Sequence, residues 1–454
     1  MSIHALCAVS PTDGRYRKQT EPLGGYFSEY ALIHYRLRVE VEYLKALCEI
    51  PLPQLKWVKA DDLQLLDGVM AAFTPEEALK VKEIEAVTNH DVKAVEYYLK
   101  EQLKGSALAP ALEFVHFGLT SQDVNNTAQP MMVRDAVNLV MVPVLKEVLA
   151  RLEEVAVDWQ HIPLLAHTHG QPASPTILGK EMAVFADRLK PMLQALESFE
   201  HSGKFGGATG NFNAHLVAYP EIDWVDFGNQ FLHDRLGLKR QRVTTQIEHY
   251  DDLAALLHLM IRINTVLLDL DRDMWTYISM NYFTQKLKEG EVGSSAMPHK
   301  VNPIDFENSE GNLGVANATF SHLAEKLPVS RLQRDLTDST VMRNIGVPFA
   351  HSLIAWKSLL RGMGKVVVNT TQIRKALDDN WAVLAEAIQT ILRREGVPNP
   401  YEQLKALTRG NQTVNAETLA AFTDQLDIPE TVKREIKALT PATYTGYNHI
   451  NLRK

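Results

Sequence analysis

The chain has 454 residues, of which 45% are hydrophobic and 22% are charged, a composition that suits a folded protein of more than one domain and excludes a disordered chain. A formal net charge of −8 and a sequence pI near 6.1 argue against general binding to nucleic acid or to an anionic membrane. The two cysteines, Cys7 and Cys48, have no metal-binding or redox spacing and the N-terminus lacks a signal-peptide pattern, so we expect a soluble cytoplasmic protein.

Apolar residues recur every three or four positions along much of the chain, which is the period of an amphipathic helix. The pattern predicts a helix whose apolar face covers residues 33–48 and a second helix that begins after the capping residue Thr74. A longer apolar stripe follows over residues 133–155, and Pro143 predicts a break or kink within it.

The longest apolar stripe runs from Asp251 to Glu289 without Pro or Gly and would extend about 58 Å as one helix at ~1.5 Å per residue. A helix of that length suits an elongated bundle, including one shared between subunits. Strand-like runs are few, and Val366–Val368 is the plainest. We therefore predict an all-α fold with an N-terminal domain over residues 1–110, a central long-helix bundle over 111–364 and a C-terminal domain over 365–454.

The most specific segment is Gly293–Pro303, which reads Gly-Ser-Ser-Ala-Met-Pro-His-Lys-Val-Asn-Pro. Lys300 offers a positive charge and Asn302 an amide donor, and the Asn-Pro pair predicts the start of a helix, whose N-terminus favours anions. The residues alone describe a clamp for a carboxylate, and residues 285–300 are predicted to be a mobile lid. A simple linker between two helices is the competing interpretation.

This segment resembles the signature of the fumarase/aspartase superfamily of lyases. Three further segments match the superfamily in order, namely Thr88–Asp91, His116–Asp123 and His167–Ala173. Each places His or hydroxyl groups beside a helix start or a turn, where backbone N–H groups can also face an anion. The resemblance covers nearly the whole chain. It implies a three-domain helical fold whose central bundle is completed by a homotetramer, with each active site shared among three subunits.

Two other segments, Ala8–Tyr16 and Arg331–Arg343, resemble the adenylosuccinate lyase branch of that superfamily. Arg15 and Arg343 supply guanidinium groups and Ser339 a hydroxyl, which are the groups that a phosphate monoester needs. Fumarate, aspartate and argininosuccinate carry no phosphate, so these residues favour a nucleotide substrate. The alternatives are another fumarate-releasing lyase, such as argininosuccinate lyase, and a non-catalytic helical scaffold.

The resemblance implies elimination of fumarate from adenylosuccinate and from the succinylaminoimidazole carboxamide ribotide of purine biosynthesis, without cofactor or metal. Ser294 matches the general base of the family, and His169 matches the general acid that protonates the departing nitrogen. The expected substrate-binding residues are Arg15, Tyr16, Asn89, His90, Asp91, His116, Thr120, Ser121, Thr168, Gln246, Ser295, Met297, Lys300, Val301, Asn302, Asn308, Arg334, Ser339, Thr340 and Arg343. For Arg331 we expect only a salt bridge on a helical face.

Overall fold

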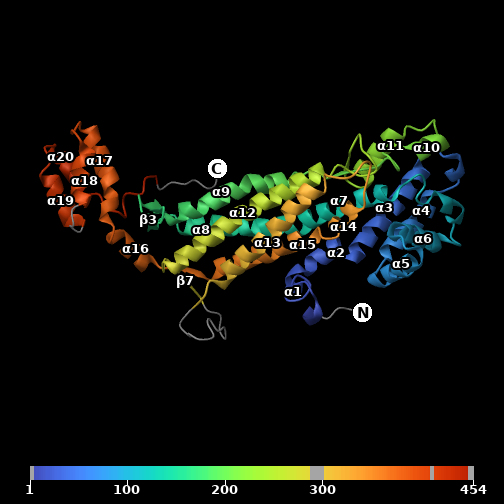
Figure 1. Cartoon of the computed structure of the whole chain (residues 1–454), viewed down its shortest axis with the longest axis horizontal. Helices are drawn as coiled ribbons and strands as arrows, with labels where there is room; N and C mark the ends of the chain where they lie inside the picture. The colour runs from blue at the N-terminus through green and yellow to red at the C-terminus, as the bar shows by residue number, and fades with distance from the viewer. Residues whose placement is uncertain (1–4, 287–300, 410–413, 448–454) are drawn as a thin grey trace. The chain divides into compact units, whose positions relative to one another are not determined.

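The computed structural model describes residues 5–286, 301–409 and 414–447, and most of these residues are helical (Figure 1). The chain divides into two compact units. Unit 1 comprises Met1–Leu145, Met192–Thr265 and Gly311–Lys357, and unit 2 comprises Lys146–Pro191, Val266–Glu310 and Ser358–Lys454. The expected all-α fold is confirmed, whereas the three-domain division at residues 110 and 364 stays a prediction.

Unit 1 is built around a buried helix, α3 (Glu29–Glu49), which packs against α4, α5, α6 and α7. The shorter helices of this unit are α1 (Arg17–Thr20), α2 (Gly24–Phe27), α4 (Ala60–Ala71), α5 (Pro75–Thr88), α6 (Asp91–Leu103), α7 (Ser121–Ala136), α10 (Asn213–Ala218), α11 (Trp224–Gln230) and α14 (Thr337–Met342). The short 3-10 helices are η1 (Ala5–Cys7), η2 (Glu21–Leu23), η3 (Pro53–Leu55) and η4 (Ala109–Phe114), and the π-helical turns are η5 (Val137–Met141) and η6 (Phe231–Arg235).

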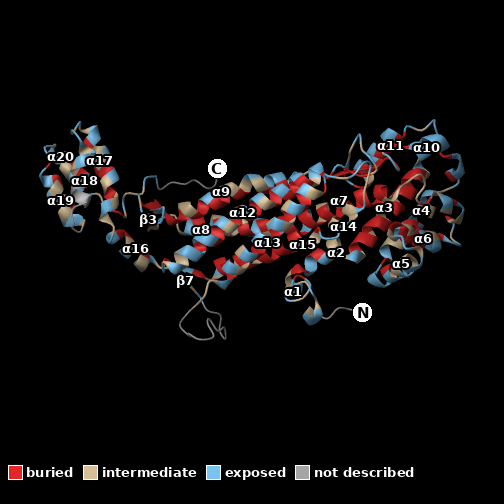
Figure 2. Ribbon diagram, viewed as in Figure 1, coloured by how far each residue is buried: buried red, intermediate tan, exposed pale blue. Residues whose placement is uncertain are grey.

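Most of α3 is buried because the helix is apolar on two faces (Figure 2). The predicted face, with Ile33, Leu37, Val41 and Leu44, lies in a cluster with side chains of α4, α5 and α6. The other face, with Tyr35, Val39, Tyr43 and Leu47, lies in a second cluster with side chains of α7, α11 and η6. The helix therefore joins two hydrophobic cores, which fixes its position within unit 1.

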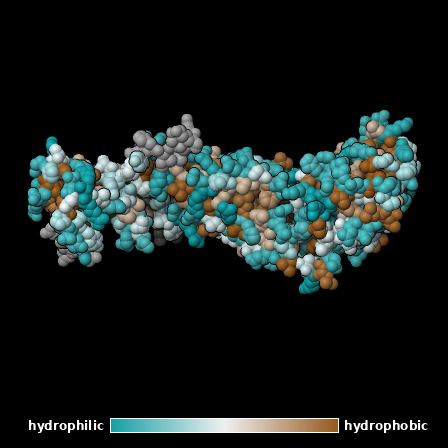
Figure 3. Space-filling model, turned by 90° about the horizontal axis from the view of Figure 1, so that it is seen from above, coloured by the Kyte–Doolittle hydropathy of each residue, from teal (hydrophilic) through white to brown (hydrophobic). Residues whose placement is uncertain are grey.

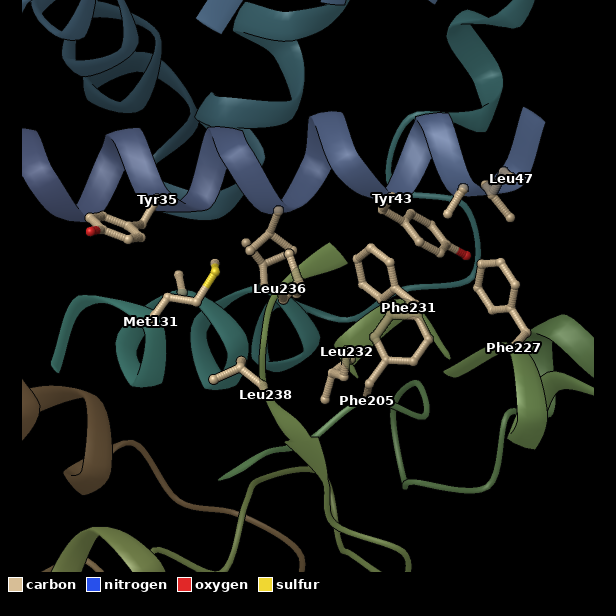
Figure 4. Close-up of a cluster of buried hydrophobic side chains, with 14 of the residues drawn as sticks. Tyr35, Tyr43, Leu47, Met131, Phe205, Phe227, Phe231, Leu232, Leu236 and Leu238 are labelled. Atoms are coloured by element: carbon tan, nitrogen blue, oxygen red, sulfur yellow. The ribbon is translucent and has the colours of Figure 1, made fainter. Parts of the chain in front are cut away.

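Tyr43 shows how the second cluster is packed (Figure 4). Its ring meets Phe205 and Phe231 edge-on, with centroids 5.6 Å apart in both pairs, and Phe227 at 6.1 Å. Edge-on aromatic pairs at this spacing add about 0.5–1.5 kcal/mol each beyond the area they bury. The cluster consequently fixes the segment of residues 205–238 against α3.

Long helices run across the division between the units: α8 (Val142–Asp158), α9 (Leu178–Glu197), α12 (Asp251–Ser279), α13 (Ile304–Lys326) and α15 (Gly346–Lys365). The interruption predicted near Pro143 is present as the π-helical turn η5, which ends just before α8. A π-helical turn shifts the backbone hydrogen-bond pattern at the point where proline cannot donate.

The prediction that α12 continues to Glu289 is wrong, because the helix ends at Ser279. Asn281 has a left-handed backbone with φ of 58°, which stops helical propagation. The chain then forms β7 (Phe283–Gln285), which pairs antiparallel with β8 (Val366–Val368), the strand that the sequence predicted most plainly. At ~1.5 Å per residue, α12 is about 44 Å long instead of 58 Å.

Within the described ranges, α12 is the helix long and apolar enough to cross a membrane by length and composition alone. Of its most apolar window, 56% is buried inside the structure, and a core helix has the same character. On the face drawn in Figure 3, hydrophobic residues are interspersed with hydrophilic ones.

Unit 2 combines short two-stranded pairings with a small helical group. Its strands are β1 (Pro163–Leu164) paired with β4 (Thr176–Ile177), β2 (His167–Thr168) paired with β3 (Gln171–Pro172), and the β7–β8 pair. In unit 1, β5 (Ser202–Gly203) pairs parallel with β6 (Lys239–Arg240). The last helices are α16 (Thr370–Asp378), η7 (Trp381–Leu384), α17 (Ala385–Arg394), α18 (Pro400–Arg409), α19 (Ala416–Asp424) and α20 (Glu430–Lys437) (Figure 1). Side chains of α17–α20 form a hydrophobic cluster of their own.

Candidate active site

The predicted site residues fall in both units and in the residues outside the described ranges. Unit 1 holds Arg15, Tyr16, Asn89, His90, Asp91, His116, Thr120, Ser121, Gln246, Arg334, Ser339, Thr340 and Arg343, and unit 2 holds Thr168, His169, Val301, Asn302 and Asn308. The predicted base Ser294, with Ser295, Met297 and Lys300, lies outside the described residues, as does most of the predicted lid.

Three predicted substrate-binding residues meet at the guanidinium of Arg334. Its Nη2 donates to Ser339 Oγ at 3.3 Å, and its Nη1 donates to Gln246 Oε1 at 3.4 Å. Its Nε is buried without a hydrogen-bond partner and lies 4.0 Å from Asp338 Oδ1. Gln246 lies 88 residues before Arg334 in sequence, and the fold brings a guanidinium, a hydroxyl and an amide together at one place. This is a suitable set of donors for an anion.

A second arginine is held by acidic residues. Arg343 donates through Nη1 to Glu29 Oε2 at 3.2 Å and through Nη2 to Asp91 Oδ2 at 3.3 Å. The buried Arg36 donates to the same Asp91 oxygen at 2.7 Å. Burial opposes ionisation of Asp91, but the two guanidinium groups hold its pKa below the usual value. The carboxylate therefore stays charged and orients Arg343, whose side chain is nearly half exposed.

The backbone at the start of α6 determines which ring nitrogen of His90 accepts a hydrogen bond. Asn89 ends α5 in the left-handed region with φ of 51°, and His90 then caps α6, because its Nδ1 accepts from the Lys93 backbone N–H at 3.1 Å. An accepting Nδ1 carries no proton, so a neutral ring holds its proton on Nε2. His90 is exposed and thus presents a fixed donor.

The buried carboxylate of Asp123 holds the His116–Asp123 segment in place. Asp123 accepts from the Thr120 N–H at 2.8 Å, which confirms the predicted capping box at the start of α7. Its other oxygen accepts from Lys204 Nζ at 2.8 Å and from the N–H groups of Gly206 and Gly207 at 2.9 and 3.1 Å. These contacts fix the helix start at which Thr120 and Ser121 lie.

Sequence reasoning missed a buried chain of polar groups that joins these parts. Asp338 accepts from Gln122 Nε2 at 2.8 Å and from Tyr250 Oη at 3.2 Å. Gln122 in turn accepts from Asn125 Nδ2 at 2.8 Å, and Asn125 accepts from Arg36 Nε at 2.8 Å. The chain links the Arg334 cluster to the Asp91 cluster. The sequence feature that could have indicated this network is the occurrence of charged and amide residues on otherwise apolar helical faces.

The predicted general acid His169 lies at the tip of a hairpin in unit 2. It forms the two-residue turn between β2 and β3 with Gly170, and both residues have positive φ, 54° and 74°. Two positive φ values are those of a type I′ turn, which matches the twist of paired strands. His169 is exposed and has no hydrogen bond to the described residues, so this chain presents its imidazole to solvent.

Two further predicted residues contact neighbours within unit 2. The Val301 carbonyl accepts from Gln285 Nε2 at 3.3 Å, and Asn308 Nδ2 donates to Ser358 Oγ at 3.1 Å. The helix predicted at Asn302–Pro303 begins at Ile304.

Of the arginines, Arg15 lies over the Tyr16 ring at 6.0 Å, and Arg331 pairs with Asp335 at 2.8 Å. The expected ion pair of Arg331 is confirmed, but it lies in the turns before α14 and not on a helix.

Comparison with known proteins assigns the class. Residues 14–317 match a family model described as Lyase. Two solved structures share the fold: a 3-carboxy-cis,cis-muconate lactonizing enzyme from Pseudomonas putida, with a TM-score of 0.74, 20% identity and 94% of each chain covered, and a fumarate lyase from Mesorhizobium sp. BNC1, with a TM-score of 0.75, 18% identity and 94% of this chain and 95% of that chain covered. The chain is a lyase of the fumarase/aspartase type.

Closer relatives define the branch. Residues 330–445 match a family model described as Adenylosuccinate lyase C-terminal. The adenylosuccinate lyase of Dictyostelium discoideum is 55% identical and that of Escherichia coli (strain K12) is 49% identical, each alignment covering 98% of both chains. The chain belongs to the adenylosuccinate lyase family.

Proposed function

We propose that the chain eliminates fumarate from adenylosuccinate, giving AMP, and from the succinylaminoimidazole carboxamide ribotide, giving aminoimidazole carboxamide ribotide. The observation that carries the substrate class is the meeting of Arg334, Ser339 and Gln246 around one guanidinium, beside a network that orients Arg343. Guanidinium and hydroxyl groups bind phosphate oxygens, and a nucleotide substrate carries a phosphate in addition to its two succinyl carboxylates. The family to which the chain belongs supports the same assignment.

In the proposed reaction, Ser294 removes the proton from the succinyl carbon beta to the leaving nitrogen. The resulting dianionic aci-carboxylate is stabilised by Lys300 and Asn302, because fixed positive charge and donors lower the energy of developing negative charge. The C–N bond then breaks, a C=C bond forms in fumarate, and His169 delivers a proton to the departing nitrogen. Its exposed position at a hairpin tip supports this role, since it leaves the imidazole accessible to a ligand.

We also propose that the active site is shared among three subunits of a cytoplasmic homotetramer. The exposed apolar side chains of Val184 on α9, Trp275 on α12 and Val315 on α13 support association through the long helices. His169, which lacks a protein partner in the described part of the chain, supports completion of the site by another subunit.

The activity is tested by incubating purified protein with adenylosuccinate and measuring AMP and fumarate by chromatography and ultraviolet absorbance. We expect both products in equal amounts, and no turnover of argininosuccinate. If neither adenylosuccinate nor the carboxamide ribotide releases fumarate, the proposed function is wrong.

A further inference from the structure

His116 pairs with a buried carboxylate on helix α3. Its Nδ1 lies 2.5 Å from Oε1 of Glu40, which projects from α3. The Glu40 side chain is fully buried, whereas the His116 side chain keeps 17% of its surface exposed. The Nε2 atom of His116 makes no hydrogen bond within the described part of the chain. One ring nitrogen, Nδ1, is therefore bound to Glu40, and the other, Nε2, is available to a ligand.

The surrounding structure fixes this arrangement. One turn after Glu40, Tyr43 Oη donates to the Phe117 carbonyl at 2.7 Å, so α3 contacts two successive residues of the same loop. Tyr43 is itself packed in the aromatic cluster of Figure 4. His116 adopts φ of 62°, a left-handed conformation that is strained for a non-glycine residue. The fold maintains that backbone, and with it the direction of the ring.

The carboxylate of Glu40 has few other partners. Its second oxygen, Oε2, is buried without a hydrogen bond. A neutral imidazole would leave a buried carboxylate without a countercharge, which is strongly unfavourable. Burial works against protonation of His116, but the charge of Glu40 and its hydrogen bond outweigh burial and raise the pKa of the imidazole above its usual value.

Two other carboxylates face the ring, and both are already paired. Glu96 on α6 contacts Lys93 at 2.8 Å and Lys100 at 3.2 Å. Asp123 on α7 contacts the buried Lys204 at 2.8 Å. Their charges are largely balanced by these ammonium groups. Glu40 is therefore the carboxylate that determines the state of the imidazole.

We propose that Glu40 is a positioning residue that holds His116 as an imidazolium, with Nδ1–H bound to Glu40 and Nε2–H directed toward an anionic group of the substrate. This inference rests on the proposed function. Glu40 does not touch the substrate and acts through His116. The ligand group is an anionic oxygen, either of the phosphate or of a succinyl carboxylate, and a charged donor binds it more strongly than a neutral one.

The test compares KM and kcat of wild type and Glu40→Gln between pH 6 and 8. The glutamine keeps the shape but removes the charge, so His116 loses its proton near ~6.5, the usual value for histidine. We expect KM of the variant to match wild type at pH 6 and to be about tenfold higher at pH 8, the difference between a charged and a neutral hydrogen bond, with kcat changed less than twofold.

The matched control is Glu42→Gln on the same helix, since Glu42 pairs with Lys45 and Arg235 and not with a histidine. We expect it to keep the wild-type pH profile. A Glu40→Gln variant whose KM shows the wild-type pH profile overturns the proposal, as does an equal rise of KM at every pH.

A second comparison avoids any change at Glu40, in case Glu40→Gln does not fold. His116→Gln provides a neutral donor at every pH, so the ratio of its KM to that of wild type should stay constant, at about tenfold, from pH 6 to 8. A ratio that falls to one by pH 8 shows that His116 is not held charged, and the proposal fails. Wild-type turnover of adenylosuccinate in the same series tests the proposed function separately.

Product inhibition identifies the anionic group. AMP carries the phosphate and fumarate carries the carboxylates. We expect the inhibition constant of one of them to follow the pH dependence of Glu40→Gln. If neither inhibition constant changes, His116 binds no anionic group of the substrate, and the proposal is wrong.

Discussion

The Lys204–Asp123 pair offers the sharpest test of how the candidate site is held in place. Both side chains are fully buried, and Lys204 Nζ lies 2.8 Å from Asp123 Oδ1. Lys204→Met removes the ammonium but leaves a buried carboxylate. Removing one partner of a buried pair costs about 3–5 kcal/mol. Asp123 keeps the backbone donors of Thr120, Gly206 and Gly207, so we expect the lower end, about 3 kcal/mol.

Differential scanning calorimetry measures this effect. A loss of about 3 kcal/mol lowers the unfolding midpoint by roughly 6–12 °C, by the scaling for domains of 150–250 residues. The double variant Asp123→Asn/Lys204→Met removes both charges of this pair and should be more stable than Lys204→Met alone. A single variant within 1 °C of wild type, or a double variant less stable than the single one, would refute the reasoning.

Further predictions concern strain, ligand binding and pH. Gly118→Ala should lower the unfolding midpoint, since Gly118 has φ of 68° and an added Cβ would lie 2.8 Å from the His215 ring; an unchanged midpoint contradicts this. Arg334→Met should raise KM for adenylosuccinate about tenfold or more with little change in kcat, whereas the control Arg331→Met should bind as wild type does; equal effects would remove Arg334 from the binding set. Asp271 is buried, and burial raises its pKa well above the usual value. The folded state therefore retains a proton that the unfolded chain releases above pH ~4. The free energy of unfolding of wild type should therefore fall by up to ~1.4 kcal/mol per pH unit relative to that of Asp271→Asn as pH rises above that value, measured by urea unfolding; wild-type stability that rises relative to the variant with pH has the wrong sign.

The sequence predicted helices correctly where apolar residues recur with a helical period. It did not predict where α12 ends, because the backbone conformation of one residue determines that point. The faces of α3 and α12 follow a helical period, and Thr74 caps α5 as predicted, with Oγ1 accepting from the Glu77 N–H at 3.4 Å. The predicted end of α12 was wrong for two reasons. Asn281 has a left-handed backbone, and β7 pairs with β8, which lies about eighty residues later in the chain. Neither signal is visible in the spacing of apolar residues.

For the candidate site, the motifs indicated which residues belong to it but not which other side chains hold those residues in place. The meeting of Arg334, Gln246 and Ser339 joins segments far apart in sequence, and only tertiary packing brings them together. Glu40 lies on α3, and the histidine that it contacts follows 76 residues later in the chain. Buried charged residues depend on partners from other helices, and such partners cannot be predicted from a local pattern.

The central claim is that fumarate is eliminated at a site to which different chains contribute His169 and Ser294. Two variants, His169→Ala and Ser294→Ala, should each be inactive while still binding substrate. When the two are mixed under mild dissociating conditions and reassembled, some sites receive both intact residues, and we expect part of the adenylosuccinate-cleaving activity to return. Each variant treated alone should stay inactive. Verified hybrid tetramers without recovered activity would show that both residues come from one chain or that one role is misassigned.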